Sequence, residues 1–232
     1  MQVILFIYGL AFFSLGLTIW LRYDPRSTLK LAQILWFLAG FGLLHGLKDW
    51  LDLWALSPSF PSYLQTASPY LLLSSFLFLF EFGRRLLLDS LIGQASEMIA
   101  VRVLSPWIYV PLLAVLGFIS LHSEQSSLSL TIWSRYLPGF LGSTMATLGT
   151  FLFCKYRLHQ EDPATGLAHH HLAWYLVALS FLVYAIRCRT GDGILQPVSF
   201  LRFERGGFSP DLRNSHTTGS GHVRNHTRLF DR

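Results

Sequence analysis

Six long apolar runs limit what this chain can fold into more than any other feature. A transmembrane helix needs about 20 predominantly apolar residues to cross roughly 30 Å of hydrocarbon. Runs that reach or approach this length cover residues 3–21, 31–53, 69–88, 103–121, 136–154 and 167–186. The runs are continuous, which excludes the alternating strands of a membrane barrel. Because backbone in lipid must satisfy its own hydrogen bonds, the sequence predicts an all-α, polytopic transmembrane helix bundle of about six spans.

The composition excludes several other classes of protein. Apolar residues make up 52% of the chain and charged residues 13%, whereas a soluble domain carries about 25% charged residues. An ordinary soluble enzyme, a disordered chain and a disulfide-stapled secreted domain are therefore excluded. Cys154 and Cys188 stand alone, without the spacing of a metal site. A disulfide between them stays open, although Cys154 has the setting of a small buried hydrophobe.

The distribution of basic residues among the short loops predicts the orientation. Lys and Arg are concentrated in the loops after the first, third and fifth runs and are absent from residues 53–68. Since cytoplasmic loops are enriched in Lys and Arg, these three loops are expected to face the cytoplasm and the N-terminus the outside. Tryptophans near the ends of the runs fit the aromatic belts of a bilayer; they are Trp20, Trp50, Trp54, Trp107, Trp133 and Trp174.

The chain divides into two parts of different composition. Residues 1–186 carry a net charge of +1, whereas residues 187–232 hold eight Arg, four acids and no Lys. The net charge of +5 is therefore a property of the second part and no sign of nucleic-acid binding. We expect a membrane domain over 1–186 and a basic, disordered tail over 187–232.

Two further features concern the packing of the bundle. Residues 89–102 mix apolar and polar positions and are expected to form an interfacial helix between the third and fourth spans. Small residues allow helices in a membrane to approach closely, and glycines of the second and fifth runs suit such packing. They are Gly40, Gly42, Gly46, Gly139 and Gly142.

The end of the second run carries the strongest candidate site. His45 and Asp49 are four residues apart, as are Lys48 and Asp52, so each pair shares a helix face. Ionisable groups inside a span are costly and indicate function. One interpretation is a ligand, proton or metal site that opens to the outside. The other is a helix end whose charges reach the interface and pair locally.

Glu81 and Arg85 are also four residues apart, at the end of the third run, and should form a structural charge pair. A histidine trio at 169–171 invites a metal or haem interpretation. However, His45 and His171 are expected at opposite faces of the membrane, which favours an interfacial polar cluster there. The chain lacks the phosphate-binding and nucleophile motifs of soluble enzymes, so we expect no catalytic residues, no metal and no cofactor.

Three segments together resemble one family. They read FGLLHGLKDW at 41–50, SFLFLFEFGRRL at 75–86 and RYLPGF at 135–140. Over about residues 1–186 the chain resembles the multi-helix N-terminal membrane region of bacterial sensor histidine kinases and related diguanylate-cyclase signalling proteins. The resemblance implies a sensory or anchoring function, not a catalytic one, for six residues, which are His45, Asp49, Asp52, Glu81, Arg85 and Arg135.

The chain departs from this family after Ile186. The family continues into a phosphoacceptor helix and an ATP-binding domain, and neither follows here, so we expect a truncated module that is not an enzyme. One hypothesis is that the sequence from about Arg187 onward is translated out of frame. The competing hypothesis is a polybasic tail that binds anionic lipid, which requires the tail to face the cytoplasm.

These observations favour a sensory or anchoring module in the bacterial inner membrane. Its expected partners are the lipid bilayer, a second copy of the chain, and a cytoplasmic output domain or response regulator. The first alternative is a small transporter or channel-like protein with His45, Asp49, Asp52 and Glu81 along a pathway. The second is a haem-binding or quinone-interacting membrane subunit.

Overall fold

The computed structural model describes residues 2–23, 30–57, 61–94, 97–123, 126–156 and 171–190. Every regular element in these ranges is helical. In chain order they are α1 (Gln2–Arg22), α2 (Lys30–Trp54), α3 (Ser62–Leu91), α4 (Glu97–Val103), η1 (Pro106–Ile108), α5 (Tyr109–His122), α6 (Ser126–Ser134), η2 (Arg135–Gly139), α7 (Phe140–Tyr156) and α8 (His171–Thr190). The predicted all-α helix bundle is confirmed.

Within the described residues, five helical stretches are long and apolar enough to cross a membrane. They are α1, the α2 residues 31–54, the run from α4 to α5, the run from α6 to α7, and the α8 residues 172–190. Large apolar side chains on α1, α5 and α8 point away from the protein, as lipid contact requires. Residues 69–88, expected as the third span, form the middle of α3, which lies in the interior of the bundle.

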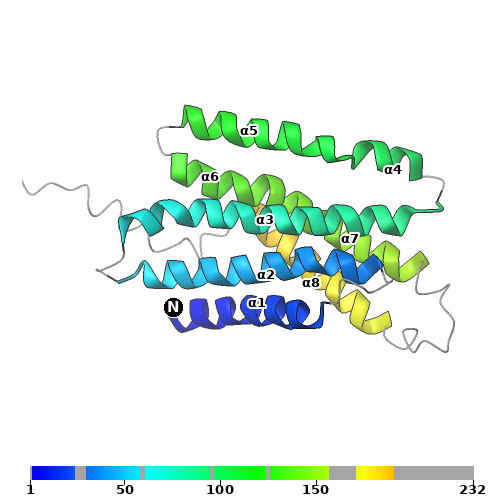
Figure 1. Ribbon diagram of the computed structural model, residues 1–232, viewed down its shortest axis with the longest axis horizontal. Coiled ribbons are helices and arrows are strands. Elements are labelled where there is room, and N and C mark those ends of the chain that lie inside the picture. The colour runs from blue at the N-terminus through cyan, green and yellow to red at the C-terminus, as the bar shows by residue number, and fades with distance from the viewer. Residues whose placement is uncertain are drawn as a thin grey trace, which may run out of the picture.

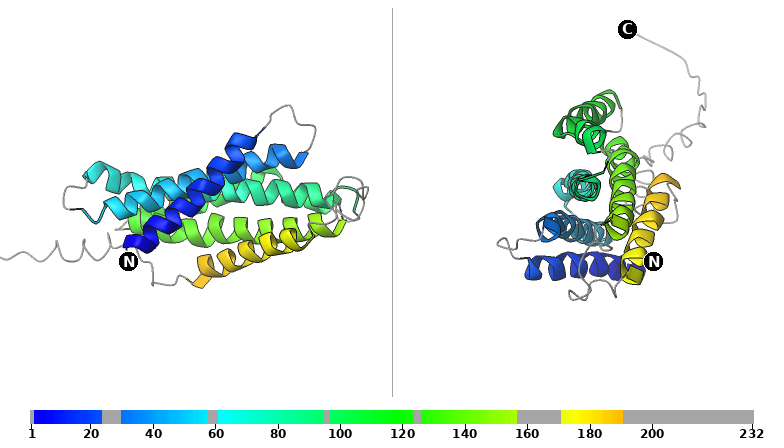
Figure 2. Two further views of the ribbon diagram at one scale, coloured as in Figure 1. Left: turned by 90° about the horizontal axis from the view of Figure 1, so that it is seen from below. Right: turned by 90° about the vertical axis from the view of Figure 1, so that its right-hand side faces the viewer.

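The helices form two layers (Figure 1). Seen end-on, α1, α2, α3 and the α4–α5 pair stand in one row, and α7 and α8 stand in a second row beside it (Figure 2). The close pairs are α1 with α2, α2 with α3, α3 with α7, and α7 with α8. Helix α3 therefore has neighbours in both layers.

Glycines set the two closest helix crossings, as the sequence predicts. A Cβ atom on Gly46 of α2 would lie 2.6 Å from the carbonyl oxygen of Gly9 in α1. On α3, a Cβ atom on Gly83 would lie 2.5 Å from the carbonyl oxygen of Gly142 in α7. Because backbone meets backbone at both places, a larger residue would push the helices apart.

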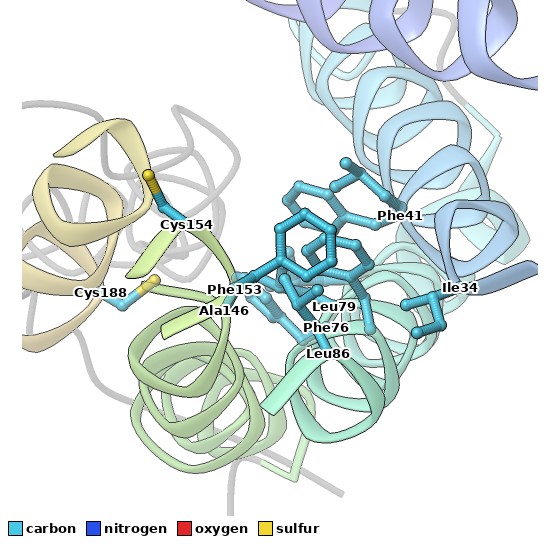
Figure 3. Close-up of a cluster of buried hydrophobic side chains, with 12 residues drawn as sticks. Ile34, Phe41, Phe76, Leu79, Leu86, Ala146, Phe153, Cys154 and Cys188 are labelled. Carbon is cyan, nitrogen blue, oxygen red and sulfur yellow. The ribbon is translucent and has the colours of Figure 1, made fainter. Parts of the chain in front are cut away.

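A core of large apolar side chains fills the space between the layers. Phe41 of α2, Phe76 and Leu79 of α3, and Phe153 of α7 meet there (Figure 3). Leu79 is fully buried, and Phe41 and Phe76 are each 2% exposed. This core holds α2, α3, α7 and α8 together, because the buried Cys188 of α8 belongs to the same cluster.

Several boundaries differ from the expected ones. Residues 89–91 complete α3, and after a turn at Gly93 (φ 82°) α4 runs in line with α5, so no single interfacial helix covers 89–102 (Figure 1). Helix α8 continues through Thr190, so the first four residues of the predicted tail are helical. The rest of that tail, 191–232, lies outside the described residues, as do residues 167–170 and with them His169 and His170.

Candidate functional site

The C-terminal part of α2 turns a polar face into the protein. His45 is 6% exposed, and Lys48 and Asp49 are each 5% exposed, whereas Leu47 is 43% exposed. Residues three and four apart share one face of a helix, which explains why these three polar residues are buried together. Asp52 continues the same face and is partly buried.

His45 connects three helices through its two ring nitrogens. Its Nδ1 lies 3.2 Å from Ser75 Oγ on α3, and its Nε2 lies 3.1 Å from Tyr184 Oη on α8. Because the Ser75 hydroxyl donates to the Leu72 carbonyl at 2.7 Å, the consistent arrangement has Nδ1–H donating to Ser75 and Tyr184 donating to Nε2. This is a neutral tautomer with both nitrogens satisfied. We call His45, Ser75 and Tyr184 the His45 node.

Aromatic rings enclose the His45 node. The rings of Phe12, Phe41 and Phe76 have centroids 4.8, 5.1 and 5.5 Å from that of His45. These rings come from α1, α2 and α3, and Phe12 also packs edge-on against Tyr184 of α8. Four helices therefore meet at one buried polar contact in an apolar setting, where hydrogen-bond geometry is tightly constrained.

Lys48 pairs closely with Asp52 and only distantly with Asp49. Its Nζ donates to Asp52 Oδ2 at 2.5 Å and lies 3.9 Å from Asp49 Oδ1. The Ser68 hydroxyl donates to the other oxygen of Asp52 at 3.2 Å. Asp52 is therefore well paired, whereas Asp49 Oδ2 is buried without a hydrogen-bond partner among the described residues.

Arg135 approaches this cluster from the second layer. It begins η2, a five-residue π-helical segment that contains the buried Pro138. Proline lacks an N–H and its ring clashes with the carbonyl four residues earlier, so the chain widens locally, and such π segments often occur at functional sites. The charge of Arg135 interacts with Asp49 and with His45.

A second polar cluster surrounds Glu81 in the other half of α3. Glu81 accepts two hydrogen bonds from Arg84, at 2.7 and 2.6 Å, and one each from Arg85 and Tyr109, both at 2.5 Å. Arg84 Nη1 also donates to the Leu104 carbonyl at 2.7 Å. These bonds attach α3 to the α4–α5 stretch. We call Glu81, Arg84, Arg85 and Tyr109 the Glu81 cluster.

The two clusters are separate. Ser75 and Glu81 are six residues apart on α3, which is about 9 Å along a helix, and Ser68 is about 20 Å from Glu81 by the same measure. The four expected residues of α2 lie together, and Glu81 pairs with Arg85 as the spacing predicts. Glu81 does not join the α2 residues in one site.

Sequence reasoning missed the partners of these residues. Ser75, Tyr184 and Tyr109 each lie inside an apolar run, where a single hydroxyl gives no signal of its own. Arg84 was not singled out beside Glu81 and Arg85, although it is 7% exposed. Its i, i+3 spacing from Glu81 is the signal that could have found it.

The described ranges give little support to a metal or haem site. Within them, no group of three His, Cys, Asp or Glu side chains could hold a metal ion. Both ring nitrogens of His45 are already bonded within the protein. Neither cysteine forms a disulfide in the structure, and both are buried. Cys154 interacts with Tyr175 and Cys188 with Arg135, and Tyr175 and Cys188 are about 20 Å apart along α8, so the disulfide left open by the sequence is absent.

Comparisons with known protein families, with curated proteins and with solved structures find no match to this chain.

Proposed function

We propose that this chain is a membrane sensory module in which α8 changes its position relative to α2 and α3. The observation that carries the proposal is the His45 node, where Tyr184 of α8 donates to a ring that is also bonded to α3. A stimulus that alters this contact alters the arrangement of three helices at once. The resemblance to the membrane regions of bacterial sensor kinases supports the same function.

The packing of α8 supports its movement. It lies mainly against α7, with a smaller contact to η2. It reaches the first layer through side chains such as Phe181 against Phe82 and Tyr184 against His45. A small set of side chains therefore links α8 to the first layer, and a shift of a packed helix is a common switching motion. A stimulus acts by binding one of two arrangements more tightly than the other.

The alternative of a small transporter or channel has weaker support. A pathway for ions would bring His45, Asp49, Asp52 and Glu81 to one continuous cavity. Instead, Glu81 has four hydrogen bonds of its own, about 9 Å along α3 from the His45 node. The unpartnered oxygen of Asp49 is the one observation that favours transport.

The remaining parts of the proposal concern the surroundings of the module. We place it in the bacterial inner membrane with its N-terminus outside, because the basic loops predict that orientation. Its proposed partners are a second copy of the chain and a cytoplasmic signalling protein that reads the position of the helices. The end of the bundle that holds the His45 node then faces the outside, and the Glu81 cluster lies in the cytoplasmic half.

Distance measurements between spin labels test the movement of α8. Labels at Leu47→Cys on α2 and Ser180→Cys on α8, both exposed positions, are introduced into full-length protein in which Cys154 and Cys188 are replaced by alanine. In lipid nanodiscs we expect two distance populations, and Tyr184→Phe should shift their ratio. Tyr175→Phe, on the same helix but 44% exposed and away from His45, is the matched control and should leave the ratio unchanged.

A single distance population that is identical in Tyr184→Phe would contradict the proposal. Measurements of ion flux in proteoliposomes distinguish the sensory module from a transporter or channel. Flux above that of empty vesicles, abolished by Asp49→Asn, would favour a transporter, whereas a sensory module should give no flux.

A further inference from the structure

Asp49 is the least satisfied ionisable group in the described part of the chain. It is 5% exposed, and its Oδ2 atom has no hydrogen-bond partner among the described residues. Its nearest cation, Lys48, lies 3.9 Å from Oδ1 and is bonded to Asp52 at 2.5 Å. A buried carboxylate without a full partner is costly in a low-dielectric interior, and such groups usually take up a proton instead.

Charged and titratable groups from four elements lie within electrostatic range of Asp49. Lys48 and Asp52 belong to α2, and Arg135 belongs to η2. Tyr8 of α1 and Tyr184 of α8 also lie within electrostatic range of Asp49. We call Asp49 and these five groups the Asp49 site.

Space in the Asp49 site limits what can bind there. The Oδ2 atom is closed off from solvent. A cavity of about 490 Å³ near the ends of α1 and α2 is lined by Gln2, Phe6 and Trp54 among others, and Asp49 is not part of its lining. A proton needs no such space, and the cations Lys48 and Arg135 repel a metal ion.

We propose that Asp49 is a proton-binding site whose occupancy sets the distance between α2 and η2. With an O–H bond on Oδ2, Asp49 is neutral and has no need of an ion pair with Arg135. This agrees with the described residues, in which Oδ2 has no partner and the one cation within 4.0 Å of Asp49 is Lys48. When the proton leaves to water at the nearby end of the bundle, the carboxylate attracts the guanidinium of Arg135. The proposal rests on the sensory function above and names external acidity as its stimulus.

The π segment provides the means of movement. Arg135 is the first residue of η2, so a displacement of its side chain acts directly on this irregular turn. Helix α8 packs against η2, and its Cys188 lies within electrostatic range of Arg135. A shift of η2 is thereby passed to the same helix that Tyr184 attaches to His45.

Infrared difference spectroscopy of the full chain in lipid measures the proton directly. We expect a carboxylic acid C=O band that shifts in D2O, that disappears as the buffer pH is raised, and that is absent in Asp49→Asn. Asp89→Asn, a partly buried acid in the last turn of α3, is the control and should keep the band. Asn has the size of a protonated Asp, so Asp49→Asn should fold, which its thermal unfolding in detergent checks.

A second variant tests Arg135. Arg135→Gln removes a cation that favours the deprotonated form, so loss of the band should move to higher pH. An unchanged pH dependence in Arg135→Gln would overturn the pairing. A band that persists in Asp49→Asn, or its absence in wild-type protein at every pH, would overturn the proton site. Either result would leave the spin-label test of the sensory module standing.

Discussion

At the scale of single residues, His45 is held by partners that are far apart in the chain. Ser75 and Tyr184 are 30 and 139 residues away from it. The helical period was sufficient to predict that His45, Lys48, Asp49 and Asp52 share a face, because that depends on local spacing. It could not reveal the partners of His45, because they depend on how distant helices pack.

Removing the hydroxyl of Tyr184 tests the strength of the His45 node. Tyr184→Phe should lower the free energy of unfolding by about 1–3 kcal/mol, since the buried Nε2 of His45 is left without its donor. Thermal unfolding in detergent micelles measures the change. Ser180→Ala is the control, because its exposed hydroxyl donates to the Val177 carbonyl within α8. Equal stability of Tyr184→Phe and wild type would show that this hydrogen bond contributes little.

Glu81 should matter more to stability than any single partner that it binds. Glu81→Gln leaves the buried Arg84 without a counter-charge and should cost about 3–5 kcal/mol. Tyr109→Phe removes one hydrogen bond to a charged group and should cost about 1.5–3 kcal/mol. Unfolding by sodium dodecyl sulfate titration compares the two variants. If Tyr109→Phe were the more damaging change, the ion pairs would not be the main attachment of α3.

At the scale of helices, close packing follows from small residues that can be recognised in the sequence. The glycines of α2 and of the fifth run were expected to allow close approach, and Gly42, Gly46 and Gly142 do contact backbone of a neighbouring helix. Their partners Gly9, Gly16 and Gly83 were not singled out, because a pattern on one helix does not identify the helix that it meets. The π segment was also missed, although Pro138 inside an apolar run marks it.

A pair of glycine variants tests the α3–α7 crossing. Gly83→Ala places a Cβ atom 2.5 Å from the Gly142 carbonyl oxygen and 2.7 Å from the Ala146 nitrogen, and such overpacking costs about 1–3 kcal/mol. Gly117→Ala in α5 meets nothing within 4 Å and should stabilise by about 0.5–1 kcal/mol through helix propensity. Thermal unfolding of the two variants should therefore change in opposite directions. A loss of stability in both variants would show that α3 and α5 tolerate alanine poorly at these glycines whether or not a neighbouring helix is close.

At the scale of the whole molecule, the bundle was predictable and its layering was not. Hydropathy alone yields the long apolar helices, because lipid requires continuous runs. It does not distinguish a helix that faces lipid, such as α1, from one surrounded by protein, such as α3. The difference depends on neighbours: Phe76, Leu79 and Phe80 of α3 are at most 2% exposed, whereas Val3 of α1 is 68% exposed.

Cysteine labelling in intact cells tests the orientation. Gln2 and Ser57 line one cavity and so lie at the same end of the bundle. Ile92, 42% exposed, follows the far end of α3. With Cys154 and Cys188 replaced by alanine, a membrane-impermeant maleimide added outside should label Gln2→Cys and Ser57→Cys but not Ile92→Cys. Labelling of Ile92→Cys alone would reverse the topology, and equal labelling of all three would contradict a membrane-spanning bundle.

The long chain separation between His45 and Tyr184 has a consequence for biosynthesis. The Glu81 cluster closes early, because Tyr109 is translated only 28 residues after Glu81. Tyr184 of α8, the second partner of His45, is translated 139 residues after it. A nascent chain arrested before Tyr184 therefore carries an imidazole nitrogen among phenylalanine rings that stays without its donor until α8 has been made.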